Sequence, residues 1–246
     1  MRLYDEIIHD ILTSLEKQDK HILPVGAAAD PVSRDWQDAG KAMMILQPDM
    51  AYELGGHNLP AVGNTLVTTG KDFVPEDEII LIGKDLPEIT EDTPYARIAL
   101  VRVAEDSIGT GDRLYNTIRN IGYFRYHIYP KGFMLRVSSS NDRESVRVEA
   151  EALNEGLNFT AIGNAMLRAL HLHKAVEAVK IIFITEPGFD YGRLQAGLKK
   201  TKQITATIDH MLKDVNMDCG SCGLQEICDE IEGLREMHFG MSEEHT

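Results

Sequence analysis

The chain has 246 residues, of which 43% are hydrophobic and 26% charged, so it is long enough to bury the core of one large domain or two small ones. Its formal net charge of −14 argues against nucleic-acid binding, because phosphate contacts need a surplus of lysine and arginine. No apolar run reaches the roughly 18 residues that span a bilayer, and residues 1–17 form a charged amphipathic stretch rather than a signal peptide. We therefore expect a cytoplasmic protein with a solvated acidic surface that binds neither nucleic acid nor membrane.

The first half of the chain alternates between helical and extended patterns. An apolar stripe at helical spacing predicts a helix over residues 2–18, and it consists of Leu3, Ile7, Ile8, Ile11, Leu12 and Leu15. A second helix is expected over residues 33–46. Short runs rich in Ile, Val and Leu, bounded by Gly, Pro or Asp, predict strands over residues 21–28, 51–54, 66–69, 79–82 and 96–103.

The second half reads as more helical. The pattern predicts helices over residues 111–121, 143–155, 160–175, 189–200 and 203–215. Residues 124–129 and 133–138 resemble a hairpin around Pro130, and the apolar run 179–185 predicts a strand buried on both sides. Interleaved strands and helices indicate an α/β fold, with a mixed sheet flanked by helices over residues 1–215. A small C-terminal cysteine-rich metal-binding module with a closing helix is expected over residues 216–246.

The three cysteines of the chain, Cys219, Cys222 and Cys228, lie within ten residues in the pattern C-x2-C-x5-C. An odd, clustered number is a poor disulfide framework and is typical of a metal site in a reducing compartment. Gly220 and Gly223 allow the tight turn that brings two thiolates to one metal. Thiolates suit iron–sulfur clusters and zinc, so both stay open, as do free thiols in a capped turn.

The fourth ligand of such a site is not fixed by the sequence. His238 lies ten residues after Cys228, which is about 15 Å along a continuous helix, so it reaches the same cluster only if the helix breaks near Gly233. His238 also falls on the apolar stripe of that helix, which favours a packing role. Asp218, Asp229, an external ligand or an open coordination position are the alternatives.

Other motifs carry weaker signals. The loop Gly55–Gly56–His57–Asn58 follows a strand, where it could approach a ligand or simply form a turn. His171 and His173 point to different faces of the predicted helix and make a poor metal pair. Thr160 is interpreted as a helix cap.

Several segments together resemble acetyl-CoA synthase, the component that partners carbon monoxide dehydrogenase. Their order and spacing agree from about residue 21 to residue 190. The segments are Tyr52–Gly56 (YELGG), Ile79–Asp85 (IILIGKD), Gly132–Met134 (GFM), Leu153–Leu157 (LNEGL) and Lys180–Pro187 (KIIFITEP).

This resemblance implies a [4Fe–4S] cluster held by Cys219, Cys222 and Cys228, with His238 at the position of the family's fourth cysteine. It also implies a corrinoid protein or a carbon monoxide dehydrogenase subunit as partner, besides a possible homo-oligomer. The family's nickel site needs a Cys-Gly-Cys motif, which this sequence lacks, and the chain is shorter than the family's catalytic subunit. Bound nickel is therefore not expected.

Three hypotheses follow. In the first, the protein is an iron–sulfur component of anaerobic one-carbon metabolism with an electron-transfer or accessory role. In the second, zinc stabilises a non-catalytic interaction module. In the third, the protein is a CO-methylating acetyl-CoA synthase whose missing ligands come from another subunit. Whether the chain is an enzyme is left open by the sequence.

Overall fold

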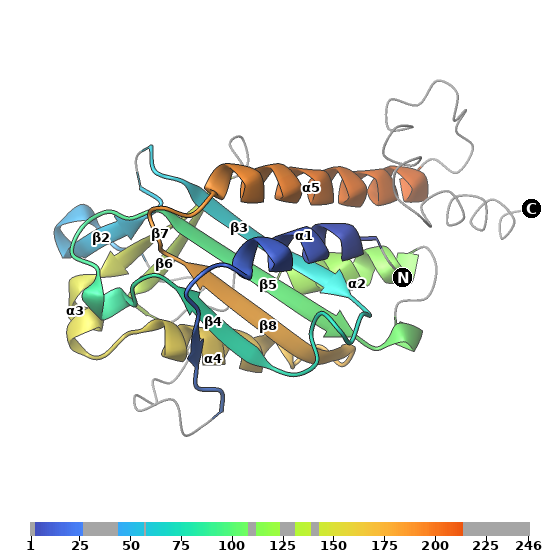
Figure 1. Ribbon diagram of the computed structural model, residues 1–246, viewed down its shortest axis with the longest axis horizontal. Coiled ribbons are helices and arrows are strands. Elements are labelled where there is room, and N and C mark those ends of the chain that lie inside the picture. The colour runs from blue at the N-terminus through green and yellow to red at the C-terminus, as the bar shows by residue number, and fades with distance from the viewer. Residues whose placement is uncertain are drawn as a thin grey trace, which may run out of the picture.

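The computed structural model describes residues 3–26, 44–56, 58–107, 112–123, 131–138 and 143–213. Two β-sheets form its framework (Figure 1). The larger sheet has five strands and is covered by helices on both faces, while the smaller sheet has three strands and lies at one end of the larger one. The expected α/β fold, with a mixed sheet flanked by helices, is confirmed for the described part of the chain.

The five-stranded sheet has the order β1-β4-β8-β5-β3. Its strands are β1 (His21–Leu23), β3 (Ala61–Thr68), β4 (Glu78–Ile82), β5 (Tyr95–Val103) and β8 (Val176–Ile184). The central strand β8 is parallel to β4 on one side and antiparallel to β5 on the other. β3 runs parallel to β5, and β1 runs antiparallel to β4, so the sheet is mixed.

The three-stranded sheet is antiparallel and has the order β2-β7-β6. Its strands are β2 (Met50–Leu54), β6 (Phe133–Ser138) and β7 (Arg143–Glu149). The burial of β7 alternates, with Glu144, Val146 and Val148 buried and the residues between them partly exposed. This period of two places one face of the small sheet against the rest of the protein.

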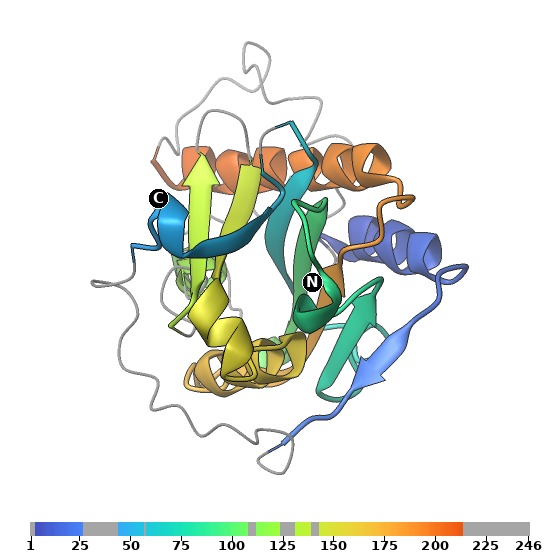
Figure 2. The same ribbon diagram turned by 90° about the vertical axis from the view of Figure 1, so that its left-hand side faces the viewer.

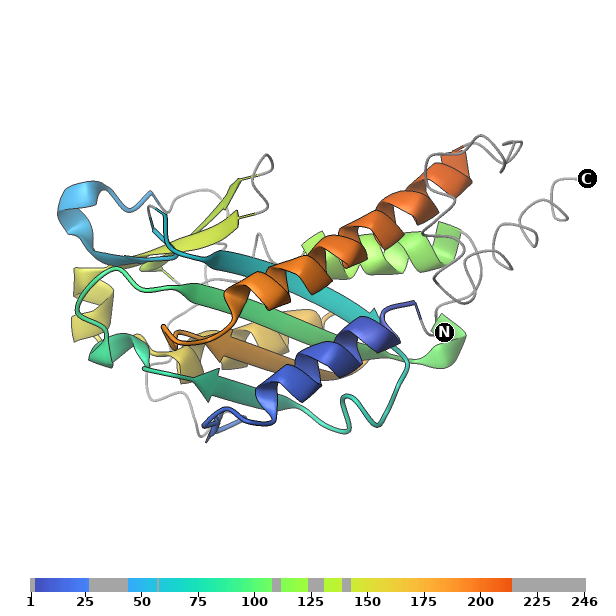
Figure 3. The same ribbon diagram turned by 45° about the horizontal axis from the view of Figure 1, so that its top comes forward.

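Helices cover the two faces of the large sheet unequally. α1 (Asp5–Leu15) and α5 (Tyr191–Lys213) lie side by side across one face (Figure 3). α4 (Phe159–Leu170) packs against β4 and β8 from the other face, where the three-stranded sheet also lies (Figure 2). α2 (Asp112–Tyr123) contacts both β3 and α5, and the short α3 (Ala150–Asn154) follows β7. Single 3-10 turns occur at Gln47–Asp49 (η2), Leu86–Glu88 (η3) and Glu105–Ser107 (η4).

The cross-strand register shows which side chains share a face. Asn64 of β3 lies beside Ile98 of β5, which lies beside Ile182 of β8, and Asn64 donates a hydrogen bond to Thr201 of α5. These residues therefore point to the α1–α5 face. Their neighbours along each strand point the opposite way, as the stacking of Phe183 on Phe159 of α4 shows.

A buried ion pair connects the two sheets. Arg97 of β5 is fully buried and donates from Nε and Nη2 to the two carboxylate oxygens of Glu144 on β7, at 2.6 and 3.0 Å. Its Nη1 also donates to the backbone oxygen of Asn64 at 3.2 Å. The carboxylate of Glu144 occupies the space beside Gly63, where any Cβ would collide with it. The bidentate geometry and the additional carbonyl satisfy both charges inside the protein.

Two local predictions are wrong, and a third concerns residues outside the description. Residues 143–149 form strand β7 rather than the start of a helix, and only α3 at 150–154 is helical in that region. β6 pairs with β7, whereas residues 124–129 lie outside the described residues, so the hairpin expected between them and residues 133–138 stays a prediction. The two helices expected over residues 189–215 are one continuous helix, α5, because Leu194, Leu198, Thr201, Ile204 and Ile208 keep a single buried stripe through it.

Other predictions hold or fall outside the description. The α1 stripe is confirmed, with Ile7, Ile8, Ile11 and Leu15 buried. β3 begins at Ala61, five residues before the strand expected over residues 66–69, and residues 44–46 of the expected helix are not helical. Among the helices of the described ranges, none is both long enough and apolar enough to cross a membrane. The expected boundary between residues 215 and 216 lies outside the described residues and stays a prediction.

The buried pair predicts a distinct mutational pattern. Arg97→Met or Glu144→Gln alone should lower the free energy of unfolding by about 3–5 kcal/mol, because each leaves an uncompensated buried charge. The double variant Arg97→Met/Glu144→Leu should recover most of that loss. Chemical denaturation followed by circular dichroism would measure all three.

The control is Glu177→Gln, which breaks a pair between Arg102 and a half-exposed Glu177 and should cost less than about 1 kcal/mol. Equal losses in Glu144→Gln and Glu177→Gln would contradict the assigned role.

Candidate functional site

The predicted metal ligands lie outside the described residues. Cys219, Cys222, Cys228 and His238 all follow Lys213, the last residue of α5. Among the residues that the structure describes, no group of three or more His, Cys, Asp or Glu side chains is placed to hold a metal ion. Any metal site formed by this chain's thiols must therefore involve the C-terminal segment, since it contains all three cysteines.

The segments that carry the family resemblance meet in the structure. The hydroxyl of Tyr52 on β2 donates to the carbonyl of Leu86 at 2.6 Å, directly after the IILIGKD segment. Thr185, which follows β8, donates from Oγ1 to the carbonyl of Lys84 at 2.7 Å. β4 and β8 are parallel, so the contact of Thr185 with Lys84 joins the carboxyl ends of two neighbouring strands. Gly83 has a φ of 98°, and a Cβ there would lie 2.5 Å from the backbone nitrogen of Glu186.

Phe159, the first residue of α4, lies at the centre of this region. Its ring stacks on Phe183 of β8 with a centroid distance of 4.5 Å and on Tyr95 of β5 at 6.4 Å. Phe133 of the GFM segment meets it edge-on at 6.4 Å. Aromatic pairs in these geometries contribute beyond the area they bury. Each family-like segment contributes to one hydrophobic core, through buried residues that include Tyr52, Ile79, Phe133, Leu157 and Ile181.

A carboxylate at the edge of this core acts as a double cap. Oδ1 of Asp85 accepts hydrogen bonds from the backbone nitrogens of Leu86 and Phe159, at 2.7 and 2.8 Å. It thereby caps the 3-10 turn η3 and reaches the start of α4, whose own N-cap is Asn158 rather than the expected Thr160. Desolvation by burial raises the pKa of Asp85, with a smaller contribution from the charge of Glu88, while the two backbone hydrogen bonds oppose the rise.

The turn after β2 is fixed by backbone contacts. Gly55 has a φ of 68°, and its N–H donates to the carbonyl of Thr93 at 2.6 Å. The guanidinium of Arg143 donates to the carbonyls of Gly55 and Leu59 at 2.8 and 2.9 Å. Of the two interpretations of this loop, the structured turn agrees with the described contacts, whereas His57 lies outside the described residues.

Glu53, just before this turn, lies in a polar cluster on the outer face of the small sheet. Only 6% of its surface is exposed, and its carboxylate accepts hydrogen bonds from Arg136 of β6 and Ser145 of β7. Its backbone nitrogen donates to the carboxylate of Asp92 at 2.7 Å. The cluster fixes all three strands of the small sheet to the loop before β5.

The two histidines considered from the sequence have separate partners. Nε2 of His171 lies 2.8 Å from a carboxylate oxygen of Asp77, which also accepts a hydrogen bond from the backbone nitrogen of Val179. Nδ1 of His173 accepts from the backbone nitrogen of Ala175 at 3.3 Å. Both therefore stabilise the turn between α4 and β8.

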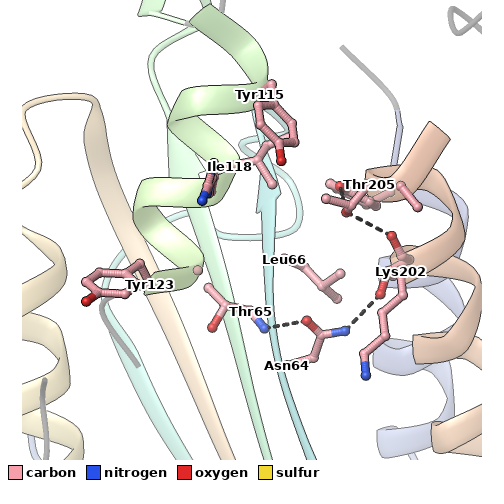
Figure 4. A pocket seen from close by; sticks show the side chains of 13 residues that line it. Asn64, Thr65, Leu66, Tyr115, Ile118, Tyr123, Lys202 and Thr205 are labelled. Atoms are coloured by element: carbon pink, nitrogen blue, oxygen red, sulfur yellow. Dashed lines mark hydrogen bonds between the residues drawn. The ribbon is translucent and has the colours of Figure 1, made fainter. Parts of the chain in front are cut away.

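A cleft of about 490 Å³ lies between α2, the outer edge of β3 and α5 (Figure 4). Its lining includes the apolar side chains of Leu66 and Ile118 and the cationic residues Arg119 and Lys202. Sequence analysis missed this cleft, since its walls come from segments near residues 64, 118 and 202. A second cleft of similar volume lies between α1 and α5, and it mixes acidic residues such as Asp10 with basic ones such as Arg193.

The fold and the described contacts define a mixed-sheet α/β protein in which five family-like segments build one core. A family model for the CO dehydrogenase/acetyl-CoA synthase complex beta subunit matches residues 38–188, more than half of the chain. No curated protein matches the chain. The chain belongs to the CO dehydrogenase/acetyl-CoA synthase complex beta subunit family, which confirms the resemblance found in the sequence.

The double cap at Asp85 gives a pH-dependent prediction. A raised carboxyl pKa means that the folded state binds this proton more tightly than the unfolded state does. Stability should therefore fall as the pH rises from the ordinary carboxyl pKa near 4 through the raised pKa of the folded state. Asp85→Asn keeps Oδ1 as acceptor but cannot ionise, so wild type should lose stability relative to this variant over that interval.

Denaturant unfolding of both proteins across the interval would measure the difference. Asp85→Ala is the companion variant, because it removes both caps and should be about 1–2 kcal/mol less stable than Asp85→Asn at every pH. If the difference in unfolding free energy between wild type and Asp85→Asn did not change with pH, the pKa of Asp85 would be the same in the folded and unfolded states, which would contradict the prediction.

Proposed function

We propose that this protein is an iron–sulfur component of CO dehydrogenase/acetyl-CoA synthase metabolism, in which Cys219, Cys222 and Cys228 ligate a [4Fe–4S] cluster. The observation that carries the proposal is the family match over residues 38–188 in a chain that continues into C-x2-C-x5-C. Three thiolates within ten residues are the donor chemistry that iron–sulfur clusters use. His238 is the proposed candidate for a fourth ligand within the chain.

The described structure provides a rigid attachment for this segment. α5 is fixed to the sheet by the fully buried Ile204 and Ile208 and by the hydrogen bond from Asn64 to Thr201. Five residues separate Lys213, at the end of α5, from Cys219, and the six steps along the chain between them reach at most roughly 20 Å. A centre bound by Cys219 would therefore stay close to the end of α5.

The proposed role is electron transfer or support of a partner's site. When bound, a [4Fe–4S] cluster supplies one-electron transfer. The 246 residues contain no Cys-Gly-Cys motif, so we propose no nickel site within them. A carbon monoxide dehydrogenase subunit or a corrinoid protein is the proposed partner of the α/β body, because the family is named for its membership of that complex.

Metal analysis of protein purified without oxygen tests this proposal. We expect about four irons per chain, no nickel, and the broad visible absorbance of a cluster. Cys222→Ala should lose that absorbance and the iron, since it removes a thiolate ligand. The matched control is Ser221→Ala, which changes the neighbouring residue without touching a thiol and should keep both.

Other outcomes have definite meanings. Zinc in place of iron, in colourless protein, would replace the proposal by a zinc-stabilised interaction module. Retained nickel, together with acetyl-CoA formation from a methyl-corrinoid protein, would show a synthase completed by another subunit. An unchanged spectrum in Cys222→Ala would remove this cysteine from the ligand set.

A further inference from the structure

We propose that the cleft between α2, β3 and α5 binds an organic anion in which an apolar ring carries a phosphate or carboxylate group. None of the described lining residues is a cysteine, and the inference does not depend on the proposed cluster. Its volume of about 490 Å³ falls within the range of roughly 300–1,000 Å³ that small-molecule sites occupy.

The charge of the cleft is opposite to that of the chain as a whole. The chain carries 39 acidic and 25 basic residues, yet the described lining includes Arg119 and Lys202 and neither Asp nor Glu. Burial raises the pKa of Tyr4, a further lining residue, to about 12, although its hydrogen bond with Thr205 opposes the rise. Tyr4 is therefore a neutral hydroxyl near pH 7, and the ionised side chains of the lining are cationic.

The walls of the cleft suit a ring. Leu66 of β3 and Ile118 of α2 provide an apolar floor, and the ring of Tyr115 extends from α2 towards α5 (Figure 4). The opposite wall offers hydroxyls, since Thr205 bonds to Tyr4 at 2.9 Å. A few polar groups set in a largely apolar lining are typical of small-molecule sites. The apolar floor favours a ring, and the two cations favour an acidic substituent on it.

The sheet edge beside the cleft argues against a peptide strand as the ligand. β3 is the last strand of the sheet, so its outer edge could in principle pair with an added strand. However, Oδ1 of Asn64 accepts the backbone N–H of Thr65 at 2.7 Å, and Nδ2 donates to Thr201 at 2.8 Å. The Asn64 side chain thus ties β3 to α5, which contacts the strand from this side.

Isothermal titration calorimetry with the full chain, purified without oxygen, tests the site. The probes are phenyl phosphate, phenylacetate, inorganic phosphate and phenol. We expect phenyl phosphate or phenylacetate to bind at one site per chain, at least ~10-fold more tightly than inorganic phosphate and phenol, because only the first two combine ring and charge. The tighter of the two identifies the anionic group.

Variants locate the binding. Arg119→Gln/Lys202→Gln should weaken it at least ~10-fold by removing both cations. Arg113→Gln/Lys199→Gln is the matched control, since these exposed residues lie on the same two helices outside the lining, and it should bind like wild type. Gly122→Phe should abolish binding by filling the cleft, and it should fold, because a Cβ at Gly122 meets nothing within 4 Å.

Three results would overturn the proposal. One is the absence of saturable binding for both ring-bearing anions. Another is equally tight binding of inorganic phosphate or phenol, which would define a plain anion site or a plain apolar site instead. The third is undiminished binding in a folded Gly122→Phe protein, as judged by circular dichroism.

Discussion

The ion pair between Arg97 and Glu144 is the constraint on which the relation of the two sheets depends. A buried charged pair is stable only when its donors and acceptors are satisfied. Here the guanidinium of Arg97 donates to both oxygens of Glu144 and to the carbonyl of Asn64, and Gly63 leaves the space that the carboxylate occupies. The three-stranded sheet therefore has one position on the larger sheet in which Glu144 is neutralised. The family match over residues 38–188 contains both residues of this ion pair and every described strand of the two sheets except β1.

The structure distinguishes the segments that build the α/β body from the cysteine segment that we propose as a metal site. The segments that carry the resemblance are packing and capping elements around Phe159, so the resemblance is a likeness of the α/β body. The metal chemistry that we propose for this chain depends instead on the cysteine segment, which follows α5 in the sequence. Family membership of the α/β body therefore does not determine which metal centre the cysteines of this chain bind.

Sequence patterns predicted the elements whose burial is regular along the chain. The strand that became β8 was found because its apolar run is buried on both faces, and α1 was found through its regular stripe. β7 was missed because Glu144 occupies an inward position, which made an alternating strand read as a charged helix. α5 was divided because Gly197 and the polar run 199–203 interrupt its apolar pattern, although Thr201 is buried there. The cleft depends on tertiary contacts between distant segments, which no local pattern encodes.

The position of β8 has a consequence for how the chain acquires its structure. β8 is the last of the described strands in the sequence, yet it lies between β4 and β5, which are separated from each other by only twelve residues. During synthesis, those two strands leave the ribosome long before the strand that joins them. The nascent chain must therefore keep two apolar strands apart until about residue 184 has emerged, so the sheet assembles late and through long-range pairing. A chain that ends before β8 would expose both strands, which makes premature termination a direct route to aggregation.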